Sequence, residues 1–394
     1  CYNHIVSFRY LAFIRKELRM NKKVLLLSCN TGEGHHSAAL AVQEALLAQG
    51  AQAELADPLS FASESVRQNA TELYNSMIRN APKAFGVVYR LGEAVSSITK
   101  HSPIYIANSL YAENLLRYIL ENSFDAVVST HLYGMEACTA LRQRQKLPVP
   151  AYGVLTDYTA IPFFHETRLN GYFVPHRDLI AELTATGMDA SLLHPTGIPV
   201  SPRFAQHMPK EQAREHLSLP AGKRIYLVMT GGVGCGNIAA LCDGLLADDS
   251  SDFLALVLTG KNDKLREELT ARYAGDHRVQ AVPFTREVNL YMNASDVLIT
   301  KPGGLSSTEA AAACIPMIHL ITIPGCEEKN AAFYESHGMA RKTTSLRVAA
   351  SLAVALAGDP AACEAMRKQQ AEQINANSAQ DIARFVLCEN ANDD

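Results

Sequence analysis

The sequence predicts an α/β protein with two successive doubly wound domains, each built on a parallel sheet. Three observations support this prediction. The chain has 394 residues, which exceeds what a single hydrophobic core usually supports. Short apolar runs alternate with helical patterns along almost the whole chain, as is typical of parallel sheets. The alternation stops at residues 197–204, GIPVSPRF, and then begins again with a strand, a glycine loop and a helix.

The composition limits the classes of function. Apolar residues make up 48% of the chain and charged residues 19%, which is ordinary for a soluble globular protein. The net charge of −4 gives no reason to expect a nucleic-acid partner. The nine cysteines are scattered, with no C-x-x-C pair and no histidine pair at zinc spacing. We therefore expect reduced thiols and no metal site.

The first twenty residues, CYNHIVSFRYLAFIRKELRM, lack the small-residue cleavage site of a signal peptide. Met20 comes directly before the first strand and looks like a natural start, so residues 1–19 are expected to be a non-native or disordered lead. The expected N-terminal domain is then 20–200, and the expected C-terminal domain is 201–394. No stretch of the chain approaches the ~20 apolar residues that a membrane-spanning helix needs.

Each domain is expected to contain five strands, because short runs bounded by polar or glycine residues are typical of buried strands. In the first domain these are Val24–Ser28, Gln52–Ala56, Ala126–Ser129, Ala151–Leu155 and Gly171–Val174. In the second domain they are Ile225–Met229, Phe253–Leu258, Val279–Val282, Val297–Thr300 and Met317–Ile321.

A long insertion, about 59–122, separates the second and third strands. Its aromatic residues are mixed with Lys83, Arg90 and Lys100. Amphipathic basic-aromatic segments of this kind suit a membrane surface or a lipid substrate. Helices that simply pack on their own domain fit the pattern equally well.

The first glycine loop, SCNTGEGHHS at 28–37, follows the first strand. Its G-x-G-x-x-S spacing is close to a dinucleotide fingerprint, but Glu33 and His35 would crowd a pyrophosphate. The positive end of a helix dipole favours a neutral histidine, and a neutral imidazole can act as a general base. The alternative is that His35 and His36 only cap and pack the turn.

The second glycine loop lies in VLITKPGGLSSTEAAAACIPMI, residues 297–318, with a helix expected from about Ser306. Two interpretations stay open. Ser306 and Glu309 match the S-x-x-E capping box, in which Glu309 bonds back to the helix start. Otherwise the free amides of the helix start hold a diphosphate, while Glu309 accepts hydrogen bonds from ribose hydroxyls.

Together these stretches resemble a family of glycosyltransferases that contains monogalactosyldiacylglycerol synthase, processive diacylglycerol glucosyltransferase and the lipid II-forming enzyme of peptidoglycan synthesis. The resemblance covers about 21–345 and is strongest over 278–340. On the N-terminal side TGEGHHSAALAV, VVSTHLYG, TDY and HPTGIPVSPRF match in order. The resemblance implies the GT-B fold, in which two Rossmann-like domains face each other across a cleft.

The resemblance also implies the residues of the site. His35 takes the position of the catalytic histidine, and His36 takes a position that is often basic or variable. Asp157, on the loop after the fourth strand, could orient the acceptor or His35; a solvated turn aspartate is the alternative. The expected donor-binding residues are Phe284 and Thr285 for uracil, Gly303, Gly304, Leu305 and Ser306 for the diphosphate, Glu309 for ribose, Glu327, Glu328 and Asn330 for the hexose, and Gly231, Gly232 and Gly234 to close the cleft.

The function implied is that of an inverting glycosyltransferase, which moves a hexose from UDP-glucose or UDP-galactose to a lipid, most simply diacylglycerol. We expect no cofactor, no obligatory metal and no nucleic acid, but a contact with an anionic membrane surface. The expected location is cytoplasmic, on the inner face of the cell membrane. Cys326 stands where relatives commonly carry glutamine, and TAIPFFHE follows TDY, so the hexose and the acceptor stay open. The rival interpretations are a UDP-sugar epimerase of the same architecture and an NAD-dependent dehydrogenase.

Overall fold

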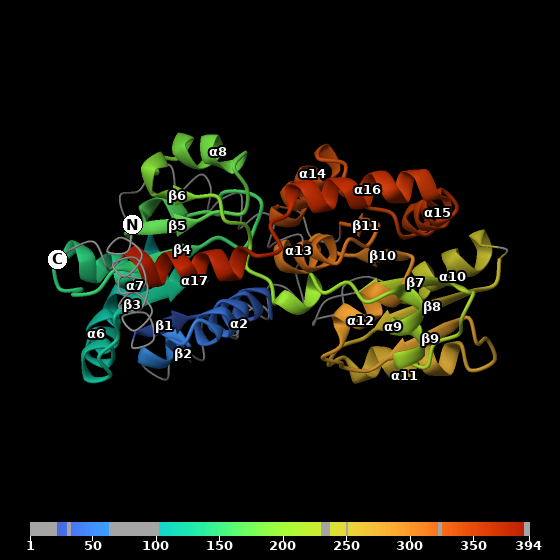
Figure 1. Ribbon diagram of the computed structural model, residues 1–394, viewed down its shortest axis with the longest axis horizontal. Helices are drawn as coiled ribbons and strands as arrows, with labels where there is room; N and C mark the ends of the chain where they lie inside the picture. Colours follow the sequence, from blue (N-terminus) through green and yellow to red (C-terminus); the bar gives the residue numbers. More distant parts are fainter. Residues whose placement is uncertain are drawn as a thin grey trace, which may run out of the picture.

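The structure is a computed structural model that describes residues 22–29, 33–62, 102–229, 237–249, 251–321 and 325–389. It contains two domains that lie side by side along the longest axis of the molecule (Figure 1). Each domain is built on a parallel six-stranded sheet. The predicted α/β class and its division into two doubly wound domains are therefore confirmed. The basic segment with Lys83, Arg90 and Lys100, the expected lead 1–19 and the glycines Gly231, Gly232 and Gly234 lie outside the described residues.

The first sheet has the strand order β2-β1-β3-β4-β5-β6. Its strands are β1 (Lys23–Leu27), β2 (Gln52–Ala56), β3 (Ala126–Ser129), β4 (Ala151–Val154), β5 (Gly171–Phe173) and β6 (Leu193–His194). The helices of the chain segment that builds it are α2 (Glu33–Ala48), α5 (Pro103–Leu110), α6 (Ala112–Glu121), α7 (Leu132–Gln143) and α8 (Leu179–Ala185), with short 3-10 turns at Pro58–Phe61, Phe164–Glu166 and Ala190–Leu192.

The second sheet has the order β12-β11-β10-β7-β8-β9. Its strands are β7 (Arg224–Met229), β8 (Phe253–Leu258), β9 (Val279–Val282), β10 (Val297–Thr300), β11 (Met317–Leu320) and β12 (Arg341–Thr343). The helices that follow the crossover turn Pro202–Phe204 are α9 (Lys210–His216), α10 (Ile238–Asp248), α11 (Asp263–Arg272), α12 (Val288–Ala294), α13 (Gly304–Ala312), α14 (Cys326–Ser336), α15 (Leu346–Ala357), α16 (Pro360–Gln373) and α17 (Ser378–Glu389).

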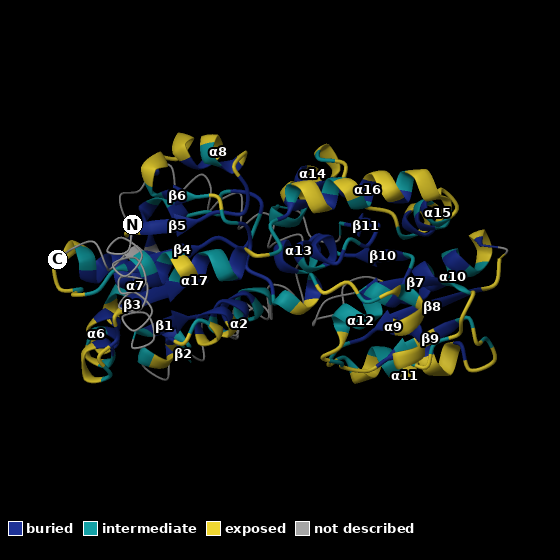
Figure 2. Ribbon diagram, viewed as in Figure 1, coloured by how far each residue is buried: buried dark blue, intermediate teal, exposed yellow. Residues whose placement is uncertain are grey.

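The ten expected strands all form, and their ends agree with the prediction to within one residue. The two additional strands, β6 and β12, are edge strands of two and three residues. Their length explains why the apolar pattern misses them. The central strands are buried on both faces, and Figure 2 shows them as a dark interior in each domain.

The last helix corrects the expected domain boundary. Residues 201–394 were assigned to one domain, but α17 packs on the first sheet, beside α2 (Figure 1). Ala379, Ile382, Ala383 and Val386 are buried in the same cluster as Val24 and Leu26 of β1 and Val42 of α2. The chain therefore crosses between the domains twice, once near 197–204 and once near 374–377.

The two crossings contact each other and form the hinge. The Asn375 side chain donates to the Thr196 carbonyl over 2.9 Å, and the Ser378 hydroxyl donates to the Ile198 carbonyl over 2.6 Å. Gly197 adopts a φ of +95°, and a Cβ there would lie 3.1 Å from the Cβ of Ser378. Glycine is favoured at this position both by the left-handed backbone and by the close approach of the second crossing.

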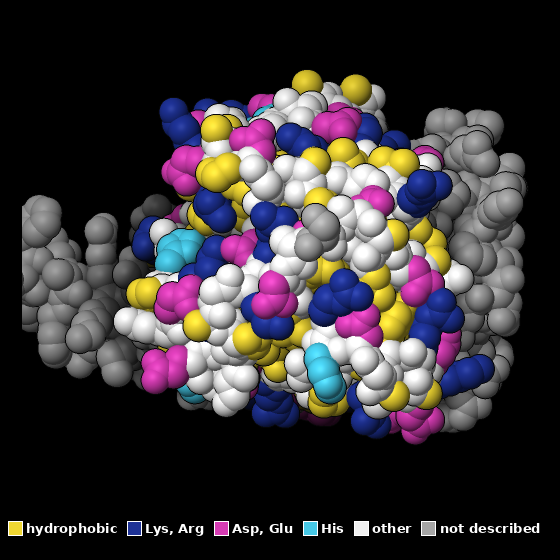
Figure 3. All heavy atoms as spheres, turned by 90° about the vertical axis from the view of Figure 1, so that its right-hand side faces the viewer, with side chains coloured by type: hydrophobic (Ala, Val, Ile, Leu, Met, Phe, Trp, Pro, Cys, Tyr) yellow, Lys and Arg dark blue, Asp and Glu magenta, His cyan; other side chains and the backbone are white. Residues whose placement is uncertain are grey.

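In the described parts of the chain no single helix combines the length and apolar content of a membrane span; one sharply bent pair, Leu346–Ala357 with Pro360–Cys388, meets those criteria. Figure 3 shows the end of the second domain that lies at the right of Figure 1. Positive and negative side chains are interspersed over this face.

Candidate active site

The two glycine loops of the sequence meet at the domain interface. Parallel sheets place ligand sites at the carboxyl ends of their strands. Helix α2 begins after the carboxyl end of β1, and α13 begins after that of β10. The two helices contact each other, and a Cβ added to Gly34 would lie 3.7 Å from the Cβ of Leu305. The loops therefore face each other across the junction.

A cavity of about 500 Å³ lies beside this contact and is lined by both domains. The first domain contributes Gly34, His36, Ser37 and Leu40 from α2. The second domain contributes five of the expected donor-site residues, namely Phe284, Thr285, Leu305, Ser306 and Glu309, together with Arg203, Lys261 and Arg286. An aromatic ring, a helix start, a carboxylate and three cations are the groups that a nucleoside diphosphate needs.

Phe284 offers a stacking surface. Among the described residues it is one of the few large apolar side chains that stay exposed, with 54% of its surface accessible. The ammonium group of Lys261 lies 5.8 Å from the ring centroid. An exposed ring with a cation over it inside a cavity can stack on a planar base.

The start of α13 settles one of the two interpretations of the second loop. The N-cap is Gly303 and the helix begins at Gly304, which makes Ser306 the third helical residue. The capping box of Ser306 and Glu309 is therefore wrong. Because a glycine N-cap has no side chain to bond to the first amides, these amides remain available to an anion.

Glu309 lies farther along α13 and is half-buried in the wall of the cavity. Burial raises the pKa of its carboxyl group to about 7, and the nearby guanidinium of Arg203 acts in the opposite direction. A carboxylate in this position can accept hydrogen bonds from hydroxyl groups of a ligand.

His35 is held in a defined tautomer. Its Nδ1 lies 2.9 Å from the carbonyl oxygen of Thr130 and 2.9 Å from the hydroxyl of Thr156. Because a carbonyl oxygen can only accept, Nδ1 carries the hydrogen and Nε2 carries the lone pair. Burial lowers the pKa of His35, although the carboxylate of Asp157 partly opposes this, so the ring is neutral at pH 7.

His35 opens onto a second, smaller pocket. Thr130, Thr156 and Asp157 line it together with apolar side chains, among which are Leu132, Met135, Ile161 and Phe164. The pocket has a volume of about 10 Å³, which is room for about one water molecule, so it could admit a hydroxyl group beside His35 but not the molecule that carries it.

Asp157 is half-buried and bonded to the other domain, so it is not a solvated turn aspartate. Its Oδ1 accepts from the side-chain amide of Asn330 over 2.8 Å. Asn330 also donates to the Pro302 carbonyl and accepts from the Tyr158 amide, over 3.1 and 2.7 Å. Asn330, expected at the hexose, is thus fully buried and connects both domains to the start of α13.

The other two residues expected at the hexose differ in their surroundings. Glu327 is only 11% exposed and pairs with the ammonium group of Lys301 at 3.2 Å, close to the start of α13. Glu328 is exposed, and its carboxylate accepts the amide hydrogen of Gly325 over 3.2 Å at the start of α14. Neither lines the 500 Å³ cavity.

Four basic or histidine side chains that line the donor cavity were not among the expected donor-binding residues: His36, Arg203, Lys261 and Arg286. Lys261 comes three residues after β8, and the carboxyl end of a parallel strand is a usable signal for a ligand site. His36 carries no such signal. Its Nδ1 is buried and has no hydrogen-bond partner among the described residues.

Replacing Gly304 by alanine tests the closeness of the two domains. A Cβ at this position would lie 1.9 Å from the Thr156 carbonyl oxygen and 3.2 Å from the Cα of Asp157. The change is expected to cost about 1–3 kcal/mol of unfolding free energy and to weaken UDP binding, since α13 must move away. Gly303→Ala is the matched control, because its Cβ meets nothing closer than 3.9 Å. Equal stability of the two variants in calorimetry would contradict this contact.

Two family sequence models match the chain, one in each half. The monogalactosyldiacylglycerol (MGDG) synthase model matches residues 35–200, and the model of the glycosyltransferase family 28 C-terminal domain matches 227–384. The first match begins at His35 and ends at the hinge. The second match contains α13, Phe284 and Glu309.

The chain is similar to proteins of known sequence and structure over nearly its full length. A processive diacylglycerol beta-glucosyltransferase of Bacillus subtilis (strain 168) is 27% identical over 375 residues, which are 94% of this chain and 96% of the relative. The crystal structure of Acinetobacter baumannii MurG matches with a TM-score of 0.62 at 16% identity, over 93% of this chain and 99% of that one. A UDP-GlcNAc 2-epimerase from Neisseria meningitidis matches with a TM-score of 0.59 at 13% identity, over 93% and 99%.

Proposed function

Because the chain belongs to the glycosyltransferases that join an MGDG synthase domain to a family 28 C-terminal domain, we propose that it transfers a hexose from a UDP-sugar to diacylglycerol. The observation that carries the proposal is the donor cavity at the domain junction, where the exposed ring of Phe284 and three cations lie with the start of α13. The names of the relatives support diacylglycerol as the acceptor. Glucose and galactose are both compatible with the site.

The proposed reaction is a single displacement at the anomeric carbon. Nε2 of His35 accepts the proton of the lipid hydroxyl as its oxygen attacks, and Asp157 stabilises the imidazolium that forms. The bond from the anomeric carbon to the diphosphate oxygen breaks on the opposite face. An α-linked donor therefore yields a β-glycoside and UDP.

Positive groups of the protein stabilise the negative charge that develops on UDP as it leaves. The free amides at the start of α13 and the side chains of Arg203, Lys261 and Arg286 are the positive groups around the cavity. Preorganised donors and cations of this kind stabilise a leaving group. We propose that they suffice without an obligatory metal ion and without a cofactor.

A lipid acceptor requires the protein to reach a membrane. We propose that it is cytoplasmic and binds peripherally to the inner, anionic face of the cell membrane, through the basic-aromatic segment around 81–118. Residues 81–101 of this segment, which carry the three cations, lie outside the described residues, so their support comes from the sequence pattern. In the described part, 102–118, Tyr105 and Tyr111 are buried, as in helices that pack on their own domain.

Replacing Lys83, Arg90 and Lys100 together by glutamine is expected to weaken sedimentation with anionic vesicles. Each cation near such a surface contributes about 1 kcal/mol, and the difference from the parent should shrink at high salt. A matched control replaces three cations of the second domain by glutamine, namely Lys264, Arg347 and Lys368. Equal sedimentation of variant and parent at low salt would contradict this membrane role for the segment.

The proposed function is tested by supplying UDP-glucose or UDP-galactose, tritiated in the hexose, together with diacylglycerol vesicles. A hexosyltransferase moves the label into an organic-soluble product, and the preferred donor identifies the hexose. An epimerase would give a changed nucleotide sugar or free sugar without needing lipid. A dehydrogenase would need NAD. Either result would reject the proposal.

A further inference from the structure

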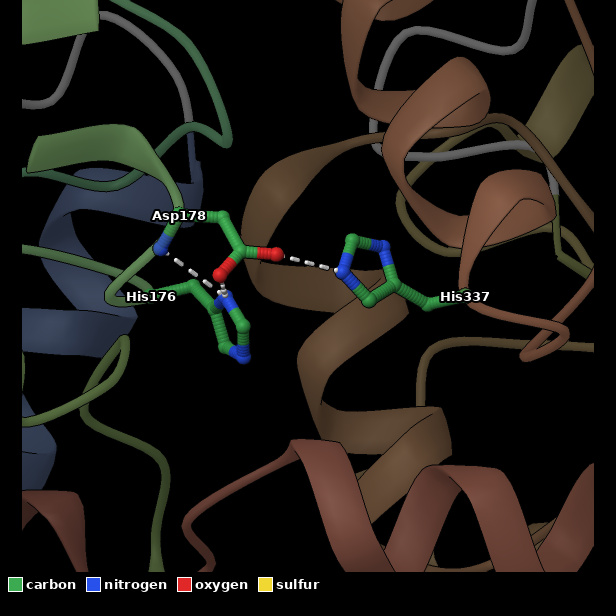
Figure 4. A group of neighbouring side chains, drawn as sticks. All are labelled: His176, Asp178 and His337. Atoms are coloured by element: carbon green, nitrogen blue, oxygen red, sulfur yellow. Dashed lines mark hydrogen bonds and ion pairs between the residues drawn. The ribbon is translucent and has the colours of Figure 1, made fainter. Parts of the chain in front are cut away.

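A second polar cluster joins the two domains away from the cavity and from the His35 pocket. His176 and Asp178 follow β5 in the first domain, and His337 follows α14 in the second (Figure 4). One side-chain ligand atom from each lies within 4.8 Å of the other two. Among the described residues this is the one group of three histidine, cysteine or acidic side chains with such a geometry. No step of the proposed reaction uses it.

The ring of His337 is oriented by its own helix. Its Nδ1 lies 2.8 Å from the carbonyl oxygen of Phe333, one turn earlier in α14. A carbonyl can only accept, so Nδ1 carries a hydrogen and the neutral ring has its lone pair on Nε2. This Nε2 lies 2.8 Å from Oδ2 of Asp178.

The ring of His176 is oriented in the same sense. Its Nδ1 accepts the amide hydrogen of Asp178 over 3.3 Å, so this nitrogen also carries the lone pair. Oδ1 of Asp178 lies 3.5 Å away. The side chain of Gln373 forms a further hydrogen bond to the His176 ring. Figure 4 shows ring nitrogens of both histidines close to the carboxylate of Asp178. The lone pair of His337 Nε2 faces this carboxylate, whereas that of His176 Nδ1 accepts the amide hydrogen of Asp178.

An acceptor facing another acceptor is unfavourable unless a positive charge lies between them. We propose that His176, Asp178 and His337 bind a divalent transition-metal ion of the zinc class, and that this ion couples the two domains. Two imidazoles and a carboxylate are a common ligand set for Zn²⁺. The hydrogen bond from His337 to a backbone carbonyl is the outer-shell contact that metal-bound histidines usually make.

The geometry needs only a small adjustment. Metal–ligand bonds of about 2.0–2.2 Å place tetrahedral ligand atoms roughly 3.3–3.5 Å apart. Nδ1 of His176 lies 3.5 Å from Oδ1 of Asp178, and Nε2 of His337 lies 2.8 Å from Oδ2 of the same carboxylate. With one ligand atom taken from each residue, all three separations are within 4.8 Å. Asp178 is 51% exposed, so its carboxylate can turn and the fourth position can hold water. His176 is 8% exposed and is the buried ligand of the proposed site.

Sequence spacing could not reveal this site. Asp178 and His337 are 159 residues apart, and they come together only because the domains close on each other. The expectation of no metal site rested on ligands that are close in sequence, which this cluster is not.

The test is calorimetric titration of the full-length protein with Zn²⁺ alone, after treatment with a chelator. The parent is expected to bind one Zn²⁺ at this site, and His176→Gln and His337→Gln are each expected to weaken that binding by roughly 100-fold. His216→Gln is the matched control, since His216 pairs with Glu287 at 3.3 Å on the surface and should leave the affinity unchanged. Asp178→Asn changes a half-exposed residue and is also expected to weaken Zn²⁺ binding. It therefore tests the proposal if a histidine variant folds poorly.

A second readout separates this site from the cysteines of the chain. Co²⁺ bound by nitrogen and oxygen gives visible d–d bands without the near-ultraviolet charge-transfer band of a cobalt–sulfur bond. The parent should show these bands, and the two histidine variants should lose them. The proposal is overturned if the parent binds no Zn²⁺, or if the variants keep its affinity. The cluster would then be an ion pair that holds only a proton.

Discussion

Replacing His35 by alanine is expected to lower kcat by about 10²–10⁴-fold, the usual contribution of a positioned general base. The tautomer fixed by the Thr130 carbonyl leaves Nε2 unprotonated, and burial lowers the pKa of the ring. UDP affinity should stay within a few-fold of the parent, because most of the lining of the donor cavity belongs to the second domain.

The pH–rate profile adds an independent check on His35. Since the pKa of His35 is lowered, the neutral base persists below the ordinary histidine pKa of about 6.5, and kcat at saturating UDP-sugar should fall only at lower pH. This acid limb should disappear in the alanine variant. His36→Ala is the matched control. His36 lines the donor cavity, so its loss should raise KM for the UDP-sugar more than it lowers kcat. A folded His35→Ala enzyme that keeps most of its kcat would reject the catalytic role.

Replacing Glu309 by alanine or glutamine is expected to weaken UDP binding by about 10- to 100-fold, because hydrogen bonds to a charged acceptor are worth about 1.5–3 kcal/mol. The helix should tolerate the change, since Gly303 rather than Ser306 is the N-cap. In the parent, UDP affinity should rise with pH through about 7, as the Glu309 carboxyl group loses its proton. Calorimetric UDP binding across this range measures both effects.

The pH dependence of folding stability should have the opposite sign to that of UDP affinity. Burial raises the folded-state pKa of Glu309 to about 7 from the ordinary glutamate value of 4.5, so between these two pH values the folded protein holds a proton that the unfolded chain has lost. The contribution of this carboxyl group to the free energy of unfolding is fully present below pH 4.5, and it is lost as the pH rises through 7. Glu309→Gln should therefore gain stability relative to the parent between pH 5 and pH 8. Unchanged UDP affinity in this variant would reject the assignment of Glu309 to the ribose.

The fold could be predicted because buried parallel strands leave a strong local signal. Every expected strand forms, since runs such as Phe253–Leu258 are apolar throughout and end at polar turns. The position of α17 could not be predicted in this way. Its apolar stripe shows that it packs on another element, but not that the chain returns to the first domain, where the ring of Phe385 contacts Tyr152 of β4 and Phe173 of β5.

The site was predicted only in part, for a similar reason. Phe284, Ser306 and Glu309 were expected from the resemblance of the stretch 278–340 to the family, and all three line the cavity. The contacts between the two domains could not be predicted from the sequence. The bonds of Asn330 to Asp157 and Tyr158, and the approach of Gly304 to Thr156, depend on how two separately folded sheets dock.

The central claim is that the two domains together form an inverting glycosyltransferase acting on a lipid. Proton NMR of the purified product, made from the α-linked UDP-sugar and diacylglycerol, tests it most directly. The account predicts a β-anomeric hexose attached to the free hydroxyl of diacylglycerol, with one UDP released for each hexose transferred. An α-anomeric product, or a nucleotide sugar altered at one carbon with no glycolipid formed, would contradict it.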